Sequence, residues 1–325
     1  MGKTNILITS AGRRVSLVRA FMTEAAKFEN IHKVFCTDMY PELSSACQVA
    51  NHSFKVDRVT SPTYIADLLT ICIKNEVRLI IPTIDTELLI LANHVDEFGS
   101  HGISILLSDK NIIEYCRDKR ALHEYFDALN ITRVKEYDKH QIQYPCFVKP
   151  IDGSRSVGTY KLNSKEELTD DIFDNPKNMF LEYIAPEQFN EFTVDIYFNK
   201  HSKICSIVPR ERIFVRDGEV NKACTRKNGI IQFLLSKFDN QKGLRGCITF
   251  QVFKQKNIDQ FYAIEINPRF GGGFPLSYLA GANFPKWIIQ EYLYDTILKE
   301  YSESWRDNTL MLRYDHEIIV NEYKN

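Results

Sequence analysis

Apolar and polar positions follow two different periods in the first hundred or so residues. Short continuous apolar runs alternate with longer segments in which apolar residues recur at helical spacing. The short runs predict buried strands and the longer segments predict helices. The predicted strands are 5–9, 32–37, 52–56, 78–82 and 103–107, and the predicted helices are 15–27, 61–75 and 86–98. This alternation is typical of a parallel, doubly wound α/β sheet.

The pattern changes from about Lys110 onward, where the strands become longer and hairpin-like in their spacing. The predicted strands are 145–149, 158–162, 179–184, 191–198, 203–215, 247–254 and 260–267. The predicted helices are 119–129, 165–172, 230–238 and 284–297, and the tail 310–320 could add a final strand. The second part is therefore expected to be a mostly antiparallel α+β region.

Composition indicates an ordinary water-soluble globular protein with two or three domains. The chain has 325 residues, 44% of them hydrophobic and 26% charged, with a net charge of -1. We expect no nucleic-acid or membrane partner, because there is no basic excess and no apolar run of membrane-spanning length. Eight scattered cysteines without a CxxC pair, and a start without a signal-peptide pattern, favour a cytoplasmic location.

The most informative chemistry lies at the end of the strand 260–267. Glu265 and Asn267 point to the same side of this strand because strand side chains repeat with period two. Their oxygens are the kind that Mg²⁺ prefers, and Arg269 adds a positive charge beside them. Gln251 lies on the preceding strand, at a separation that suits an antiparallel pair. An ordinary strand closed by a Pro-Gly turn would share these features.

A second candidate segment joins a lysine to a loop rich in glycine and serine. Lys149 ends an apolar strand, and the loop that follows can present N–H groups and hydroxyls to phosphate oxygens. The loop residues concerned are Gly153, Ser154, Ser156 and Gly158. The segment is not a Walker A loop, because Thr159 and Tyr160 replace the Lys-Ser/Thr pair. A solvated hairpin loop with a surface lysine is the alternative.

A third segment places acids and backbone groups where two strands meet. Glu182, Tyr183 and Ile184 end one strand, and Glu191 begins the next. A hinge between strands can bond an adenine edge through its backbone, while an acid accepts hydrogen bonds from ribose hydroxyls. Charged residues on a solvated strand face would look the same.

Taken together and in this order, these segments resemble the ATP-grasp superfamily, in its carbamoyl-phosphate-synthase-like branch, over nearly the whole chain. The most specific part is the run 264–269 with Gln251 at the family's spacing, followed by 281–285. Lys149 with the loop 153–158 resembles the family's lysine and glycine-rich lid. Lys119, after Asp118, resembles its first phosphate-binding basic residue.

The resemblance implies ATP with Mg²⁺ or Mn²⁺ as cofactors and assigns roles to the candidate residues. Arg269 and Lys149 would act on the transferred phosphoryl group. Metal ligands would be Gln251, Glu265 and Asn267, and nucleotide contacts would be Lys119, Lys149, Gly153, Ser154, Ser156, Gly158, Glu182, Tyr183, Ile184 and Glu191. The implied domains are a preATP-grasp domain at 1–112, a lobe with the lid at 113–183 and a catalytic lobe at 184–325.

The implied reaction activates a carboxylate as an acyl phosphate for attack by an amine, with release of ADP and phosphate. The chain is too short for a whole carbamoyl-phosphate synthase large subunit, so that reaction is not carried over. A subunit that forms an acyl or carbamoyl phosphate, and a non-catalytic ATP-binding sensor, stay open as alternatives. Small carboxylic acids and amines are the expected partners, in a possible homodimer.

The acceptor site is expected to involve arginines. Arg210 and Arg212 share one face of a predicted strand, where they could bind the acid or its acyl phosphate, away from the adenine pocket. Arg13 and Arg14 open a helix after the first strand, and Asp38 and the segment 83–87 follow equivalent strands. Solvated surface charge is the alternative for both arginine pairs.

Overall fold

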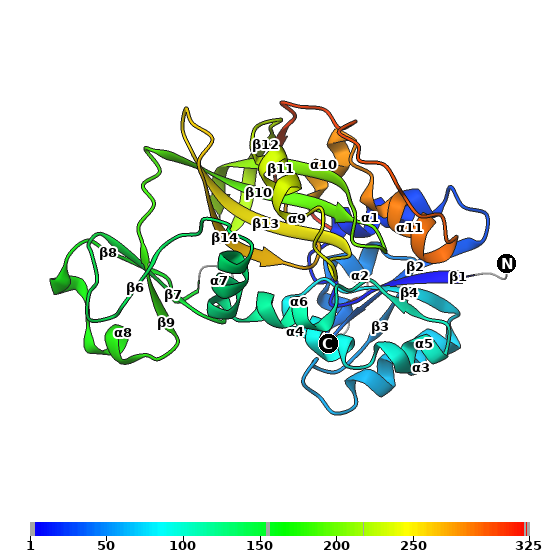
Figure 1. Ribbon diagram of the computed structural model, residues 1–325. Coiled ribbons are helices and arrows are strands. Elements are labelled where there is room, and N and C mark those ends of the chain that lie inside the picture. Colours follow the sequence, from blue (N-terminus) through cyan, green and yellow to red (C-terminus); the bar gives the residue numbers. More distant parts are fainter. Residues whose placement is uncertain (1–3, 154–156, 217, 322, 324–325) are drawn as a thin grey trace.

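Three sheets follow one another along the chain in the computed structural model, which describes residues 4–153, 157–216, 218–321 and 323 (Figure 1). The first sheet has five strands in the order β3-β2-β1-β4-β5, and all neighbouring strands are parallel. Its strands are β1 (Thr4–Ile8), β2 (Ile31–Asp38), β3 (His52–Lys55), β4 (Val77–Ile81) and β5 (Ser104–Ile105). The predicted parallel α/β sheet is confirmed.

Helices accompany this sheet along the sequence. They are α1 (Val15–Ala25), the short 3₁₀ turn η1 (Pro41–Leu43), α2 (Ser45–Val49), α3 (Tyr64–Lys74), α4 (Asp85–Ala92) and α5 (Val95–Ser100). The single helix expected at 86–98 is two helices, because the backbone leaves the helical region at His94. The ring Nδ1 of His94 lies 2.8 Å from the carbonyl oxygen of Ile90 and occupies an acceptor at the end of α4.

The second sheet has four antiparallel strands in the order β6-β9-β7-β8. They are β6 (Glu136–Tyr137), β7 (Cys146–Pro150), β8 (Tyr160–Leu162) and β9 (Asn178–Glu182). Along the sequence, α6 (Lys110–Arg117) and α7 (Lys119–Ala128) precede these strands. The 3₁₀ turn η2 (Lys165–Glu167) and α8 (Asp170–Asp174) lie between β8 and β9. The continuous helix expected at 165–172 is wrong, because Leu168 and Thr169 are extended and separate η2 from α8.

The third sheet has six strands in the order β14-β13-β10-β11-β12-β15, and every neighbouring pair is antiparallel. They are β10 (Phe189–Phe198), β11 (Ile204–Arg216), β12 (Glu219–Thr225), β13 (Gly246–Gln255), β14 (Phe261–Asn267) and β15 (Leu310–Leu312). Three helices complete it: α9 (Ile230–Phe238), α10 (Phe274–Ala280) and α11 (Phe284–Leu293). The strand β12 was not predicted, and the tail strand is shorter than expected.

One hydrophobic core joins the first and third sheets. Phe250 of β13 packs edge-on against Phe126 of α7 and Phe238 of α9. Phe21 of α1 packs edge-on against Phe270, which follows β14, and belongs to the same buried cluster. The four-stranded sheet packs in two small clusters, one of which also includes side chains of the third sheet, and it lies to one side of the molecule (Figure 1). The apolar packing shared by the first and third sheets fixes the third sheet against the first.

Two further expectations concern the chain as a whole. The eight cysteines are all free thiols, and all except Cys116 are buried, as expected for small apolar side chains. In the part of the chain that the structure describes, every helix is too short or too polar to span a bilayer.

Candidate functional site

The register of the third sheet aligns polar side chains across four strands. Thr193 of β10 is paired with Arg210 of β11 and with Gln251 of β13, and Gln251 is paired with Glu265 of β14. Residues directly opposite each other in antiparallel strands project from the same face. Gln251 and Glu265 are therefore neighbours, as their separation in the sequence predicted.

Two of the three proposed metal ligands, Glu265 and Asn267, are joined by a hydrogen bond at the end of β14, and the third, Gln251, lies opposite Glu265 on β13. Asn267 Nδ2 donates to Glu265 Oε1 at 3.0 Å, and Arg269 Nη2 lies 3.4 Å from Asn267 Oδ1. One carboxylate and two amide oxygens suit a hard divalent cation that fills its shell with phosphate oxygens. Within the described ranges, no three His, Cys, Asp or Glu side chains gather into a metal site.

Lys119 begins α7 and reaches back toward the four-stranded sheet. Asp118 caps this helix by accepting hydrogen bonds from two backbone N–H groups in its first turn, which fixes where Lys119 starts. The Lys119 ammonium donates to the carbonyl oxygens of Ile151 at 3.2 Å and Gly153 at 2.7 Å. Burial lowers the pKa of Lys119, and the Glu265 carboxylate opposes that change. Lys119 is therefore a buried cation close to the metal-ligand candidates.

Lys149, the last residue but one of β7, is a second buried cation, with only 8% of its surface exposed. Burial lowers its pKa, and Glu265 again opposes the change, whereas Lys119 adds to it. No hydrogen bond joins the Lys149 ammonium to another residue in the described part of the chain. Two buried lysines that repel each other beside one carboxylate leave positive charge that an anionic ligand could balance.

The expected nucleotide hinge is only partly polar. Glu182 ends β9, the Lys161 ammonium lies 4.2 Å from the centre of the Tyr183 ring, and Ile184 is buried in an apolar cluster. Gly158 has a φ of 70°, a left-handed conformation that favours glycine. The candidates Ser154 and Ser156 lie outside the described residues.

Glu191 begins the row of polar residues on β10 and pairs with Arg212. The Arg212 Nε and a Glu191 carboxylate oxygen are 3.0 Å apart, and Arg212 Nη1 also donates to Thr193 Oγ1 at 3.2 Å. Burial raises the pKa of Glu191, and Arg212 opposes that rise. We expected Arg212 to lie apart from the adenine side of the site. That expectation is wrong, because the sheet register brings Arg212 to Glu191.

Arg210 is completely buried in an ion pair with Asp195. Its Nε and Nη2 donate to the two Asp195 oxygens at 2.8 and 2.9 Å, and neither side chain is exposed. Among the described residues, Nη1 has no hydrogen-bond partner. A Cβ at Gly273 would collide with that same atom, so glycine is required where the loop passes over Arg210. The expected role of Arg210 toward an acid substrate stays a prediction.

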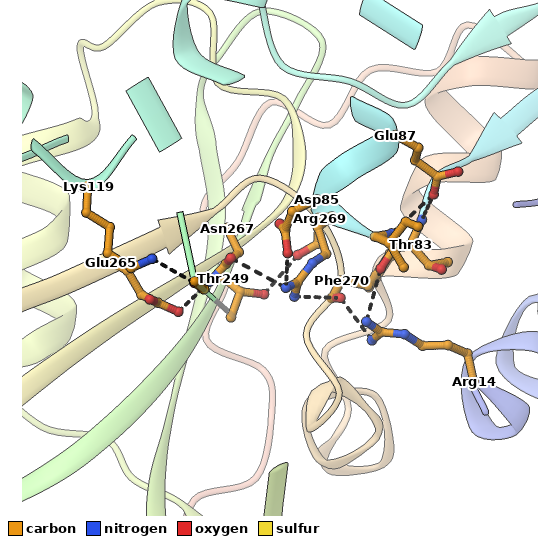
Figure 2. A network of polar contacts seen from close by, with 12 residues as sticks. Arg14, Thr83, Asp85, Glu87, Lys119, Thr249, Glu265, Asn267, Arg269 and Phe270 are labelled. Carbon is orange, nitrogen blue, oxygen red and sulfur yellow. Dashed lines mark hydrogen bonds and ion pairs between the residues drawn. The ribbon is translucent and has the colours of Figure 1, made fainter. Parts of the chain in front are cut away.

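The edge of the first sheet meets this site through a network that the sequence does not reveal (Figure 2). The Arg269 guanidinium pairs with Asp85 at 2.6 Å, and Arg14 donates to the carbonyl oxygens of Thr83 and Phe270, both at 3.0 Å. Asp38 accepts a hydrogen bond from the backbone of Gly12. The position of Asp85 after a strand of the first sheet makes it a candidate site residue, but no sequence pattern links it to Arg269.

Arg13 behaves differently from Arg14. Its side chain is 80% exposed and lies 3.6 Å from Glu219, which also accepts a hydrogen bond from Arg313. The charges at this rim thus come from three distant parts of the sequence. Sequence reasoning found Arg13 but missed Glu219 and Arg313.

Two family models match separate parts of the chain. Residues 6–106 match the model described as "PylC-like, N-terminal domain". Residues 175–311 match the model described as "ATP-grasp in the biosynthetic pathway with Ter operon". A comparison with curated proteins by sequence gives no match.

Several solved structures share the fold. The biotin carboxylase domain of the Hydrogenobacter thermophilus 2-oxoglutarate carboxylase, in complex with MgADP, ADP and bicarbonate, has a TM-score of 0.73 at 16% identity, covering 94% of this chain and 73% of that chain. The Staphylococcus aureus N5-carboxyaminoimidazole synthetase complexed with ADP gives 0.70 at 16% identity, covering 93% and 80%. The L-amino acid ligase from Bacillus licheniformis gives 0.64 at 15% identity, covering 90% and 75%.

Proposed function

We propose that this chain, which matches a PylC-like N-terminal domain at 6–106 and an ATP-grasp domain at 175–311, is an ATP-dependent carboxylate–amine ligase. One observation carries the proposal. Gln251, Glu265 and Asn267 stand on one face of the third sheet, with Arg269 bonded to Asn267. The buried cations Lys119 and Lys149 lie near Glu265. These charges suit a polyphosphate and a divalent cation.

We assign ATP and Mg²⁺, or Mn²⁺ in its place, as the cofactors. Gln251, Glu265 and Asn267 would hold the cation together with phosphate oxygens, and Lys119 and Lys149 would bind the phosphates as point charges. The adenosine end would lie toward Glu182, Tyr183, Ile184 and Glu191. The cation, when bound, neutralises charge on the phosphates. The ADP in two of the similar structures supports the nucleotide assignment.

The proposed reaction has two steps. First, an oxygen of the acid attacks the γ-phosphorus of ATP, the bond from that phosphorus to the β–γ bridging oxygen breaks, and ADP leaves. Second, the amine nitrogen attacks the acyl carbon, the bond to the phosphate oxygen breaks, and the nitrogen loses a proton. Such chemistry depends on positioning and on charge neutralisation. Arg269 is the candidate for steadying the transferred group.

The acid and amine would enter from the carboxyl edge of the first sheet. Such edges are where parallel sheets commonly bind ligands. Arg14, Asp38 and the segment 83–87 lie there, and Arg13 stands exposed at the rim. We further propose the domain boundaries 1–112, 113–183 and 184–325, a cytoplasmic location and a homodimer. Size-exclusion chromatography with light scattering tests the dimer.

Phosphate release from MgATP, measured across a panel of amino acids and small carboxylic acids with and without amines, tests the function. We expect ADP as the nucleotide product, release that needs an acid, and an amide product that needs an amine. Phosphate release with an acid alone, together with a trapped acyl phosphate, would indicate an enzyme whose final product is the acyl phosphate. Accumulation of AMP and pyrophosphate, or nucleotide binding without turnover for any pair, would overturn the ligase assignment.

A further inference from the structure

Arg269 is held by residues from two different sheets. On one side its Nη2 lies 3.4 Å from Asn267 Oδ1, on the strand that carries the metal-ligand candidates. On the other side the same nitrogen donates to the Asp85 carboxylate at 2.6 Å, and Nη1 donates to the carbonyl oxygen of Phe270 at 3.2 Å. The side chains of Arg269 and Asp85 are only 16% and 21% exposed. This ion pair is therefore well shielded from water and stronger than a surface pair.

Asp85 is in turn fixed by the buried residue Glu87. Asp85 is the first residue of α4, and Glu87 accepts hydrogen bonds from the backbone N–H of Thr83 at 2.7 Å and of Ile84 at 3.1 Å. Ser10 Oγ and Tyr64 Oη donate to its second oxygen. Glu87 thus ties the start of α4 to the loop after β1 and to α3. These hydrogen bonds fix the backbone at the start of α4 and so hold Asp85 in place.

A second connection crosses between the sheets at the same place. Arg14 at the start of α1 donates to the carbonyl oxygens of Thr83 and Phe270, so it bridges the segment before Asp85 and the segment after Arg269. Thr83 Oγ1 also donates to the carbonyl oxygens of Thr9 and Ser10. Figure 2 shows this network running from Glu87 to Glu265.

We propose that Asp85 is a positioning residue that sets the guanidinium of Arg269 beside the transferred phosphoryl group. The inference rests on the proposed function, since it gives Arg269 a phosphoryl group to act on. With Nη1 and Nη2 engaged, the Nε of Arg269 is a buried donor that has no partner among the described residues. The first sheet thereby supplies part of the support for the phosphoryl-transfer site, in addition to an acceptor surface.

Asparagine at position 85 keeps the size of the side chain and removes the charge that orients Arg269. We expect Asp85→Asn to lower kcat for acid-stimulated phosphate release roughly ten- to a hundredfold, with a change in KM for ATP of less than about threefold. Asp85→Glu retains the charge and should recover part of the lost kcat. Asp67→Asn, which neutralises an exposed acid on α3, is the matched control and should match the wild-type protein.

A double-mutant cycle separates positioning from a general effect on the fold. If Asp85 acts through Arg269, Asp85→Asn should add little to the loss that Arg269→Gln causes alone. Independent, additive losses would overturn the proposal. So would an Asp85→Asn variant whose kcat stays within about twofold of the wild type, or one whose kcat per folded molecule is normal while only its melting temperature falls.

The inference can also be tested if the wild-type protein shows no turnover, which would refute the proposed function alone. The Nε–H signal of Arg269, assigned by its loss in Arg269→Gln, reports whether the guanidinium is held in place. We expect Asp85→Asn to shift this signal and speed its exchange with water, and Asp67→Asn to leave it unchanged. An unchanged signal in Asp85→Asn would overturn the positioning role.

Discussion

The site brings several charged side chains close together in partly buried positions, an arrangement that folding alone would disfavour. Glu265 lies near Glu191, another partly buried acid, and near two buried lysines, and each interacts with it electrostatically. Protein cores rarely hold so many ionisable groups without a functional reason. At the residue scale, the site is therefore best tested by substitutions that remove a charge and preserve shape.

Glu265→Gln is expected to lower kcat for phosphate release by at least about a hundredfold while leaving the fold intact. The amide keeps the acceptor oxygen for Asn267 Nδ2 but removes the charge that would hold a cation on the transferring phosphate. ATP affinity from calorimetry should fall much less than kcat. Normal turnover of Glu265→Gln with Mg²⁺ would show that Glu265 is not a metal ligand.

Lys149→Met is expected to abolish tight ATP binding and yet stabilise the ligand-free protein near neutral pH. Burial lowers the pKa of Lys149 in the folded protein, so protonation favours the unfolded chain. The resulting cost is fully present below the lowered pKa and disappears as the pH rises toward 10.5, the ordinary value for lysine. Urea unfolding of both proteins across this range measures the difference.

In that experiment the stability advantage of Lys149→Met should shrink as the pH rises. Loss of a charge-assisted contact should weaken ATP binding by roughly ten- to a hundredfold. An advantage that is independent of pH would mean that the methionine stabilises by packing alone. Retained ATP affinity would remove Lys149 from the phosphate site.

At the scale of elements, two loops decide how the site is assembled. The segment between β4 and α4 depends on Glu87, and the loop 271–273 passes over the buried Arg210. Each is a backbone segment shaped by one buried charged side chain. The effect of a substitution in either segment on the free energy of unfolding should therefore depend on contacts with that side chain, and not on local backbone propensity.

Glu87→Leu is expected to destabilise the protein by about 2–5 kcal/mol, because the backbone N–H groups of Thr83 and Ile84 would lose their buried acceptor. Burial raises the pKa of Glu87, so a neutral side chain that still accepts hydrogen bonds should be tolerated. Glu87→Gln should therefore cost less than about 1.5 kcal/mol. Urea denaturation compares the two variants, and equal losses would contradict the role given to the accepted hydrogen bonds.

Gly273→Ala is expected to destabilise the protein by about 1–3 kcal/mol, because the added Cβ would collide with Arg210 Nη1 and crowd Val220. Gly99→Ala in α5 is the matched control, since a Cβ there meets no atom within 4 Å. The control should be neutral or slightly stabilising, because alanine favours helices over glycine. If thermal melting ranks the two variants in the opposite order, the loop 271–273 is less closely packed than this geometry implies.

At the scale of the whole molecule, features set by local patterns could be predicted from the sequence, whereas contacts between distant segments could not. The parallel first sheet and the pairing of Gln251 with Glu265 followed from periodicity and spacing, which are local properties. The strand β12 was missed, because in Glu219–Thr225 polar residues interrupt the apolar positions. The pairs Arg210–Asp195 and Arg269–Asp85 depend on how strands and sheets meet, and no local pattern encodes them.

The division of the hydrophobic core into clusters of different size predicts which part of the molecule unfolds locally first. The first and third sheets share one buried cluster, whereas the four-stranded sheet has two small ones built around residues such as Val148, Phe180 and Met179. Smaller buried clusters give lower local stability. We therefore expect amides of β7 and β9 to exchange through a partial opening, at a lower free energy than those of β1, β10 and β13.

Native-state hydrogen exchange at low urea concentrations measures these free energies strand by strand. Added MgATP should raise protection in β7 and β9 more than in β1, because the proposed phosphate and adenine contacts, Lys149 and Glu182, lie on those two strands. Glu265→Gln with the same nucleotide is the control for a shared cation and should show a smaller rise. Equal free energies in all three sheets without nucleotide would contradict the separate opening. A uniform rise with MgATP would mean that the nucleotide does not bind preferentially to the four-stranded sheet.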